Sequence, residues 1–304
     1  MMRELQMDLT KYFNERIVLN DLGFSNGKNT GDLVNEMQSH GLLVDFLDIT
    51  GEIVRVPVKA LGSKPDTGGQ RSGYYVINQL GEHYFCTFGN WKTGFEGKWS
   101  SIDTNSLSQV DRQALHKQME EASEKSKIQR KLRQDEVAVE VQEKLNICHD
   151  AVEHEYLTNK KVKSYGLKHL NGNLIVPVYS TTGAVRSLQY INKKGEKKFV
   201  SASEIKGNVF LIGTTFTELN KCEKLILVEG YSTAASVYEA TQIPVACVFS
   251  ANFLLDAARN LRKLTGARFI LALDNDESGV GERKAQECAS ATTNCAVRLP
   301  SERG

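Results

Sequence analysis

Four apolar runs decide the fold of this chain: KLILVEG at residues 224–230, PVACVFS at 244–250, RFILALDND at 268–276 and NCAVRLP at 294–300. Three stretches with the length and composition of helices separate them: STAASVYEAT at 232–241, LLDAARNLRKL at 254–264 and GVGERKAQECASA at 279–291. Strands that are apolar on both faces and alternate with helices are typical of a parallel sheet covered on both sides. The sequence therefore predicts an α/β domain over residues 216–304.

Two of these runs end in carboxylates. Glu229 ends the first run and is followed by Gly230, whereas Asp274 and Asp276 end the third at a spacing that places both side chains on one side of a strand. The carboxyl ends of parallel strands meet at one edge of a sheet, where functional loops lie. Carboxylates gathered there repel one another unless cations compensate, and oxygen ligands favour Mg²⁺ or Mn²⁺. Alternatively, Asp276 is simply the N-cap of the next helix, which leaves Glu229 unexplained.

The positive charge of the chain is concentrated in one block. The formal net charge is +1, but residues 160–206 contain ten basic and two acidic residues, so this block carries +8 and the remainder −7. Such a separation is typical of a protein that binds a polyanion. The alternative is a solvated, lysine-rich hairpin.

The rest of the chain divides into three parts. Residues 151–215 contain short runs that alternate with glycine turns, which predicts an antiparallel meander that includes NVFLIG at 208–213. Residues 106–150 are highly charged and free of glycine and proline, which predicts a helical linker with a helix over 108–146. Residues 1–105 are β-rich and predict a small α+β domain.

Aromatic and basic residues are interleaved in that first domain: Tyr74, Tyr75, Trp91 and Trp99 with Lys64, Arg71, Lys92 and Lys98. Aromatic rings stack on unpaired bases and cations hold the backbone, so we expect a template-binding module. Alternatively, the aromatic side chains fill the core of the domain.

The stretch from Cys222 to Pro300 resembles a TOPRIM domain. Its segments LVEGYSTAAS and LALDNDESG resemble the EGYxD and DGDxAG motifs of primases. The preceding residues look like the primase subdomain that comes before TOPRIM, so the resemblance covers roughly residues 150–304. It is a resemblance to plasmid- and phage-type primases and primase-helicases, with departures at Ser201, where the family has Asn, and at Gln189, near an Arg of replicative primases.

This resemblance implies a DNA-directed primase that joins ribonucleoside triphosphates into short RNA primers on a single-stranded DNA template during plasmid or phage replication. Glu229 would be a metal ligand or general base, and Asp274 and Asp276 would hold Mg²⁺ or Mn²⁺. Residues expected to bind nucleic acid or nucleotide are Lys198, which matches a basic residue of the KYLN motif, with Lys206, Lys197, Arg186, Trp91 and Lys92. The loop glycines would be Gly230 and Gly279. A helicase partner, in cis or in trans, is also implied. Primases of this family carry further acidic residues beyond the last TOPRIM strand, whereas this sequence stops at residue 304, so we expect it to be a fragment of a longer protein.

Other classes of protein and site fit the sequence less well. The six cysteines lack paired spacing and no CxxC occurs, so we expect no zinc and reduced thiols in a cytoplasmic protein. No apolar run approaches the roughly 18–20 residues that cross a bilayer, so we expect no membrane association. A TOPRIM nuclease with the same acids, and a non-catalytic single-strand-binding or loading module, remain the alternatives to a primase.

Overall fold

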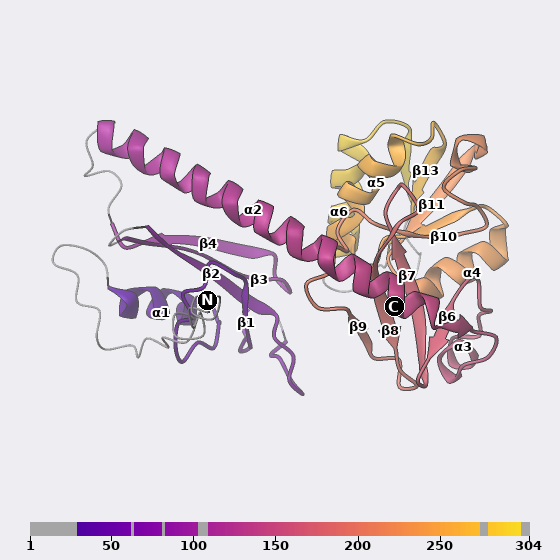
Figure 1. Cartoon of the computed structure of the whole chain (residues 1–304), viewed down its shortest axis with the longest axis horizontal. Coiled ribbons are helices and arrows are strands. Elements are labelled where there is room, and N and C mark those ends of the chain that lie inside the picture. Colours follow the sequence, from indigo (N-terminus) through magenta and orange to yellow (C-terminus); the bar gives the residue numbers. More distant parts are fainter. Residues whose placement is uncertain (1–28, 62–63, 81–82, 103–108, 274–278, 299–304) are drawn as a thin grey trace, which may run out of the picture. The chain divides into compact units, whose positions relative to one another are not determined.

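The structure is a computed structural model that describes residues 29–61, 64–80, 83–102, 109–273 and 279–298. It is a mixed α/β structure with three sheets among the described residues (Figure 1). The chain divides into two compact units, Met1–Lys127 and Ile128–Gly304.

The first unit combines one helix with an antiparallel sheet. Helix α1 (Thr30–Ser39) begins with a capping box, in which the side chains of Asn29 and Asp32 each accept a hydrogen bond from the other's backbone N–H. The sheet contains, in spatial order, β1 (Val54–Val56), β2 (Gly73–Leu80), β3 (His83–Asn90) and β4 (Phe95–Ser100). The apolar side of α1 and the buried rings of Tyr75 and Phe88 belong to one core.

Helix α2 (Gln109–Asn146) agrees closely with the helix predicted for residues 108–146. Near its C-terminal end, Val137 and Val141 are buried in a cluster with Ile175 and Leu188 of the second unit's first sheet. This part of α2 is therefore a core element as well as a connector.

The second unit begins with an antiparallel sheet. Its strands, in spatial order, are β5 (His149–Asp150), β6 (Lys168–Leu170), β7 (Asn173–Tyr179), β8 (Val185–Ile191) and β9 (Lys197–Phe199). The short helix α3 (Glu155–Lys160) lies between β5 and β6 in the chain. The predicted meander is confirmed for β7, β8 and β9, which pair in chain order.

The last sheet of the unit is largely parallel. Its strands, in spatial order, are β10 (Phe210–Ile212), β12 (Val245–Cys247), β11 (Lys224–Val228), β13 (Arg268–Leu271) and β14 (Cys295–Val297). Helix α4 (Tyr231–Thr241) shares a core with one face, and α5 (Leu254–Arg262) and α6 (Val280–Ala291) share a core with the other. The predicted parallel pairing of the four apolar runs is confirmed.

The prediction was wrong for β10. We expected it in the meander, but it pairs antiparallel with β12 at the edge of the second sheet. Just before it, Val209 and Tyr179 exchange two backbone hydrogen bonds of 2.9 Å, so the chain contacts β7 before it joins the other sheet. A three-residue strand carries too little pattern to specify its partner, and burial of Phe210 and Ile212 in the core shared by both sheets decides the pairing.

No helix within the described ranges has the length and apolar character needed to cross a membrane.

Candidate functional site

Glu229 lies at the carboxyl edge of the parallel sheet, directly after β11. The neighbouring strand β13 ends beside it, because the N–H of Ala272 donates to the carbonyl oxygen of Leu227 at 2.9 Å. Asp274 and Asp276, which we predicted to join Glu229, lie outside the described residues. The shared strand edge is therefore observed, whereas the three-carboxylate cluster stays a prediction.

The two loop glycines, Gly230 and Gly279, differ in backbone conformation. Gly279 is the N-cap of α6 and has a φ of 63°, a left-handed conformation that favours glycine. The alternative in which Asp276 caps the helix concerns a residue outside the described ranges, so it stays a prediction. Gly230 is the N-cap of α4 and is extended, and a Cβ added to it would lie 3.6 Å from the Nζ atom of Lys197.

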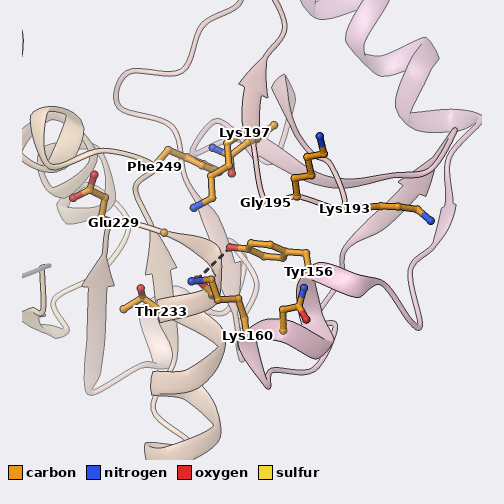
Figure 2. A pocket seen from close by; sticks show the side chains of 13 residues that line it. Tyr156, Lys160, Lys193, Gly195, Lys197, Glu229, Thr233 and Phe249 are labelled. Atoms are coloured by element: carbon orange, nitrogen blue, oxygen red, sulfur yellow. Dashed lines mark hydrogen bonds between the residues drawn. The ribbon is translucent and has the colours of Figure 1, made fainter. Parts of the chain in front are cut away.

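A pocket of about 530 Å³ opens beside Glu229 (Figure 2). Its lining comes from α3, from β8, β9 and the turn between them, from the start of α4 and from the residues just after β11 and β12: Tyr156, Asn159, Lys160, Gln189, Lys193, Lys194, Gly195, Lys197, Glu229, Gly230, Ser232, Thr233 and Phe249. In Figure 2 the side chains of Lys160 and Lys197 point toward the region in front of the Tyr156 hydroxyl, whereas Lys193 points away from it. The hydroxyl of Tyr156 donates to that of Ser232 at 3.2 Å, which joins α3 to the first turn of α4.

Three lysine side chains of the pocket have no partner among the described residues. The ammonium groups of Lys160, Lys194 and Lys197 form no ion pair or hydrogen bond with any other described residue, whereas that of Lys193 pairs with Glu155 at 2.9 Å. The N-terminal end of α4 borders the same space, and its first backbone N–H groups and helix dipole favour an anion there. These features suit a phosphate-bearing ligand, and Glu229 adds a single carboxylate to the same pocket.

Tyr231 holds the wall of this pocket in place. Its buried hydroxyl accepts a hydrogen bond from the N–H of Tyr165 at 2.8 Å and donates to the carbonyl oxygen of Lys163 at 3.0 Å. Burial raises the pKa of this phenol well above its usual value, so it remains a neutral donor. The tyrosine that follows Glu229 and Gly230 therefore fastens the loop after α3 to the first residue of α4.

The other basic residues predicted for the site lie in different surroundings. The Arg186 guanidinium is 14% exposed and pairs with both Asp135 and Glu204. Lys206 pairs with Asp256 at 3.2 Å. Lys198 is opposite Tyr190 in the sheet and does not line the pocket, although its neighbour Lys197 does.

The aromatic residues of the first unit have partners of their own. Trp91 is 37% exposed, its ring stacks on that of Tyr74 with 4.5 Å between centroids, and the guanidinium of Arg55 lies 4.6 Å from the Trp91 centroid. Tyr75 and Trp99 are buried in the core, as the alternative for these aromatic residues proposed. Trp91 thus combines an intramolecular stack with partial exposure.

Neither a metal-binding cluster nor a disulfide occurs among the described residues. Within the described ranges, which omit Asp274 and Asp276, no group of three or more His, Cys, Asp or Glu side chains is arranged to hold a metal ion. All six cysteines are free thiols. Burial raises the pKa of Cys86 and of Cys247 to about 12, which keeps both in the unreactive thiol form.

Sequence reasoning missed several residues of the pocket. Tyr156 and Phe249 were not singled out, Lys160 was only counted in the basic block, and Gln189 was noted only as a departure from a family pattern. Phe249 follows the apolar strand β12, so its place after a strand end was an available signal. Nothing in the sequence indicated that α3 would reach the parallel sheet.

No protein-family model matches this chain. Two curated relatives, both named DNA primase TraC and both from Escherichia coli, are similar to it in sequence. One is 28% identical over 247 residues, which are 76% of this chain and 23% of the relative. The other is 26% identical over 287 residues, which are 88% of this chain and 19% of the relative. The chain therefore spans about a fifth of the length of these relatives.

Solved structures give more distant likenesses. The primase fragment of the bacteriophage T7 primase-helicase protein is 17% identical, covers 50% of this chain and 65% of its own, and has a TM-score of 0.38. The Aquifex aeolicus primase, with its zinc-binding and RNA polymerase domains, is 15% identical, covers 90% of this chain and 77% of its own, and also has a TM-score of 0.38. The sequence relatives are therefore the comparison that bears on function.

Proposed function

Because this chain is similar in sequence to two proteins named DNA primase TraC and its motifs resemble those of plasmid- and phage-type primases, we propose that it carries the primer-synthesis site of such an enzyme. The observation that supports this most is the lysine-rich pocket that borders Glu229 at the carboxyl edge of the parallel sheet. A site for nucleotidyl transfer needs cations for the phosphates and carboxylates for divalent metals at one place. In this proposal residues 216–304 are a TOPRIM domain.

Glu229, Asp274 and Asp276 would together hold Mg²⁺ or Mn²⁺, because carboxylates supply only oxygen donors. The surroundings of Glu229 fit a divalent cation, since a carboxylate beside a phosphate would otherwise repel it. Such a cation supplies charge stabilisation at the phosphate oxygens during transfer.

The protein's own groups would bind and orient the reactants. Lys160, Lys197 and the N–H groups at the start of α4 would hold the triphosphate of the incoming ribonucleotide. The 3′-hydroxyl of the growing primer would then form a bond to the α-phosphorus, and pyrophosphate would leave. The template strand would run over Lys198 and Lys206, and the first unit would contribute Trp91. Arg186 is left out of this proposal, because its guanidinium is already paired with two carboxylates.

Primer synthesis tests this function directly. The full chain is incubated with mixed-sequence single-stranded DNA, labelled ribonucleotides and Mg²⁺ or Mn²⁺, beside Glu229→Gln and the double variant Asp274→Asn, Asp276→Asn. A matched control is Glu223→Gln, because Glu223 precedes β11 and Glu229 follows it. We expect short RNA products from the parent and the control, and a loss of about 100-fold or more in both site variants.

Two results would contradict the proposal. Degradation of the DNA without consumption of nucleotides would favour a nuclease that uses the same acids. If the parent and all variants bind DNA but none makes RNA products, the chain would instead be a non-catalytic module of a larger replication protein. Its helicase partner would then lie in the same polypeptide or in a separate one.

A further inference from the structure

One residue that lines the pocket is a glutamine whose amide opens into the pocket and forms no hydrogen bond with another described residue. Gln189 of β8 lines the pocket and is only 5% exposed. Its side chain has no hydrogen-bond partner in the part of the chain that the structure describes. Among the described residues, the buried side-chain polar atom without a partner is Nε of Arg262, so the amide atoms of Gln189 are accessible from the pocket. An accessible amide that is not paired within the protein is available to a ligand.

The residues around Gln189 give the amide an aromatic neighbour. In the sheet, Gln189 is opposite Phe199, and the Phe199 ring meets the edge of Phe249 with 5.7 Å between centroids. Phe249 also lines the pocket and has a φ of 68°. A left-handed phenylalanine is unfavourable and persists where the surrounding structure requires it, which occurs often at binding sites.

Lys197 brings a positive charge to the pocket near the start of α4. Lys197 is opposite Ile191, two residues from the Gln189–Phe199 pair along the same two strands, and its ammonium group lies near Gly230 at the start of α4. The pocket thus offers two kinds of contact: positive charge for phosphates near α4, and a neutral amide with an aromatic ring.

We propose that Gln189 is a specificity-determining residue that hydrogen-bonds the nucleobase of a nucleoside triphosphate whose phosphates lie at Lys160 and Lys197. The inference rests on the proposed function and deepens it. An amide presents a donor and an acceptor side by side, as does the edge of a base. A phosphate oxygen only accepts, so it would satisfy the NH₂ group of Gln189 and leave its carbonyl oxygen facing an anion. Phe249, which lines the same pocket and is 9% exposed, would give the base an apolar contact.

Binding measurements on the full chain test this inference. Calorimetry gives dissociation constants for ATP, CTP, GTP and UTP, and for inorganic tripolyphosphate as a ligand that has phosphates and no base. The variants are Gln189→Met, which keeps the length of the side chain without its amide, and Lys197→Ala. The control is Lys224→Ala, because Lys224 begins β11 at the edge of the sheet opposite Glu229.

We expect Gln189→Met to weaken the best-bound triphosphate about tenfold or more, equivalent to about 1.4 kcal/mol, and to leave tripolyphosphate binding unchanged. Lys197→Ala should weaken both ligands, and Lys224→Ala neither. Because Gln189→Met removes an amide that forms no hydrogen bond with another described residue, its melting temperature should be close to that of the parent. A merely structural role would instead lower the melting temperature.

Three results would overturn the inference: unchanged triphosphate binding by Gln189→Met, an equal loss for tripolyphosphate, or a parent that binds no triphosphate. Primer synthesis, measured separately, distinguishes this failure from failure of the proposed function. If the parent synthesises primers but Gln189→Met binds nucleotides as tightly as the parent, the inference about Gln189 is wrong and the proposed function stands. Nucleotide binding that depends on Gln189, without primers from any version, would overturn primase activity and leave the nucleotide pocket in place.

Discussion

The ammonium group of Lys92 lies 2.7 Å from a carboxylate oxygen of Asp66, whose side chain is only 1% exposed. The same carboxylate accepts hydrogen bonds from the N–H groups of Val58 and Ser72 and from the Ser72 hydroxyl. Asp66 thereby fastens the loop between β1 and β2 to the end of β3. Lys92, which we also predicted to contact nucleic acid, therefore stabilises the fold of the first unit.

This ion pair should make the stability of the first unit sensitive to acid. Burial raises the pKa of Asp66, but hydrogen bonds from Lys92, Ser72 and Val58 outweigh burial and hold the pKa at about 2, below its usual 3.8. Because the folded-state pKa is the lower one, the stabilisation is present above the unfolded pKa. It is lost as the pH falls through the folded pKa, and amounts to about 2 kcal/mol.

Urea unfolding between about pH 2 and pH 5 measures this effect. The free energy of unfolding of the parent should fall toward the acid end, and Asp66→Asn should be less stable than the parent at pH 5 but less dependent on pH. An acid dependence equally steep in Asp66→Asn would show that other groups are responsible.

The hydroxyl of Tyr231 should contribute to the stability of the second unit. Tyr231→Phe leaves the N–H of Tyr165 and the carbonyl oxygen of Lys163 without their partner, which should cost about 1–3 kcal/mol. Tyr238→Phe is a matched control on the same helix, because the Tyr238 hydroxyl forms no hydrogen bond with another described residue. Chemical denaturation measures both variants, and equal losses of stability in the two would contradict the assigned role of Tyr231.

The parallel sheet could be predicted from the sequence because its strands and helices differ strongly in pattern. Runs such as residues 224–228 are apolar on both faces, and the helices between them have few β-branched residues. The same pattern placed Glu229 at a strand end. The partner of β10 could not be predicted, because pairing of a three-residue strand depends on the core that covers it.

Trp91 should report on single-stranded DNA if the first unit binds the template. The chain has two tryptophans, and Trp99 is buried whereas Trp91 is partly exposed. Oligothymidylate should therefore change the tryptophan emission of the parent, and Trp91→Phe should remove most of that change. Trp91→Ala, which removes the stacking ring, should weaken DNA binding by about 1–3 kcal/mol. Equal affinity for DNA in a folded Trp91→Ala protein would favour a purely structural role for the stack on Tyr74.

Which of two adjacent lysines lines the pocket was beyond sequence reasoning for a reason of register. Lys197 and Lys198 are adjacent and chemically alike, and only the pairing of β9 with β8 decides which of them faces the pocket. A shift of one residue would exchange them, because successive side chains of a strand point to opposite sides. The motif resemblance selected Lys198, whereas the pocket contains Lys197.

These two lysines should therefore differ in the ligand that each affects. Lys197→Ala should weaken nucleoside triphosphate binding about tenfold or more, since it removes a cation from the pocket. Lys198→Ala should leave nucleotide affinity within about twofold but weaken single-stranded DNA binding, with a salt slope that is smaller by about 1. Calorimetry with nucleotide and fluorescence anisotropy with labelled DNA at several salt concentrations measure the two effects. Both variants remove one positive charge from the same strand. If both lose the same nucleotide affinity and the same DNA affinity, then the overall charge decides binding and the face of the strand does not.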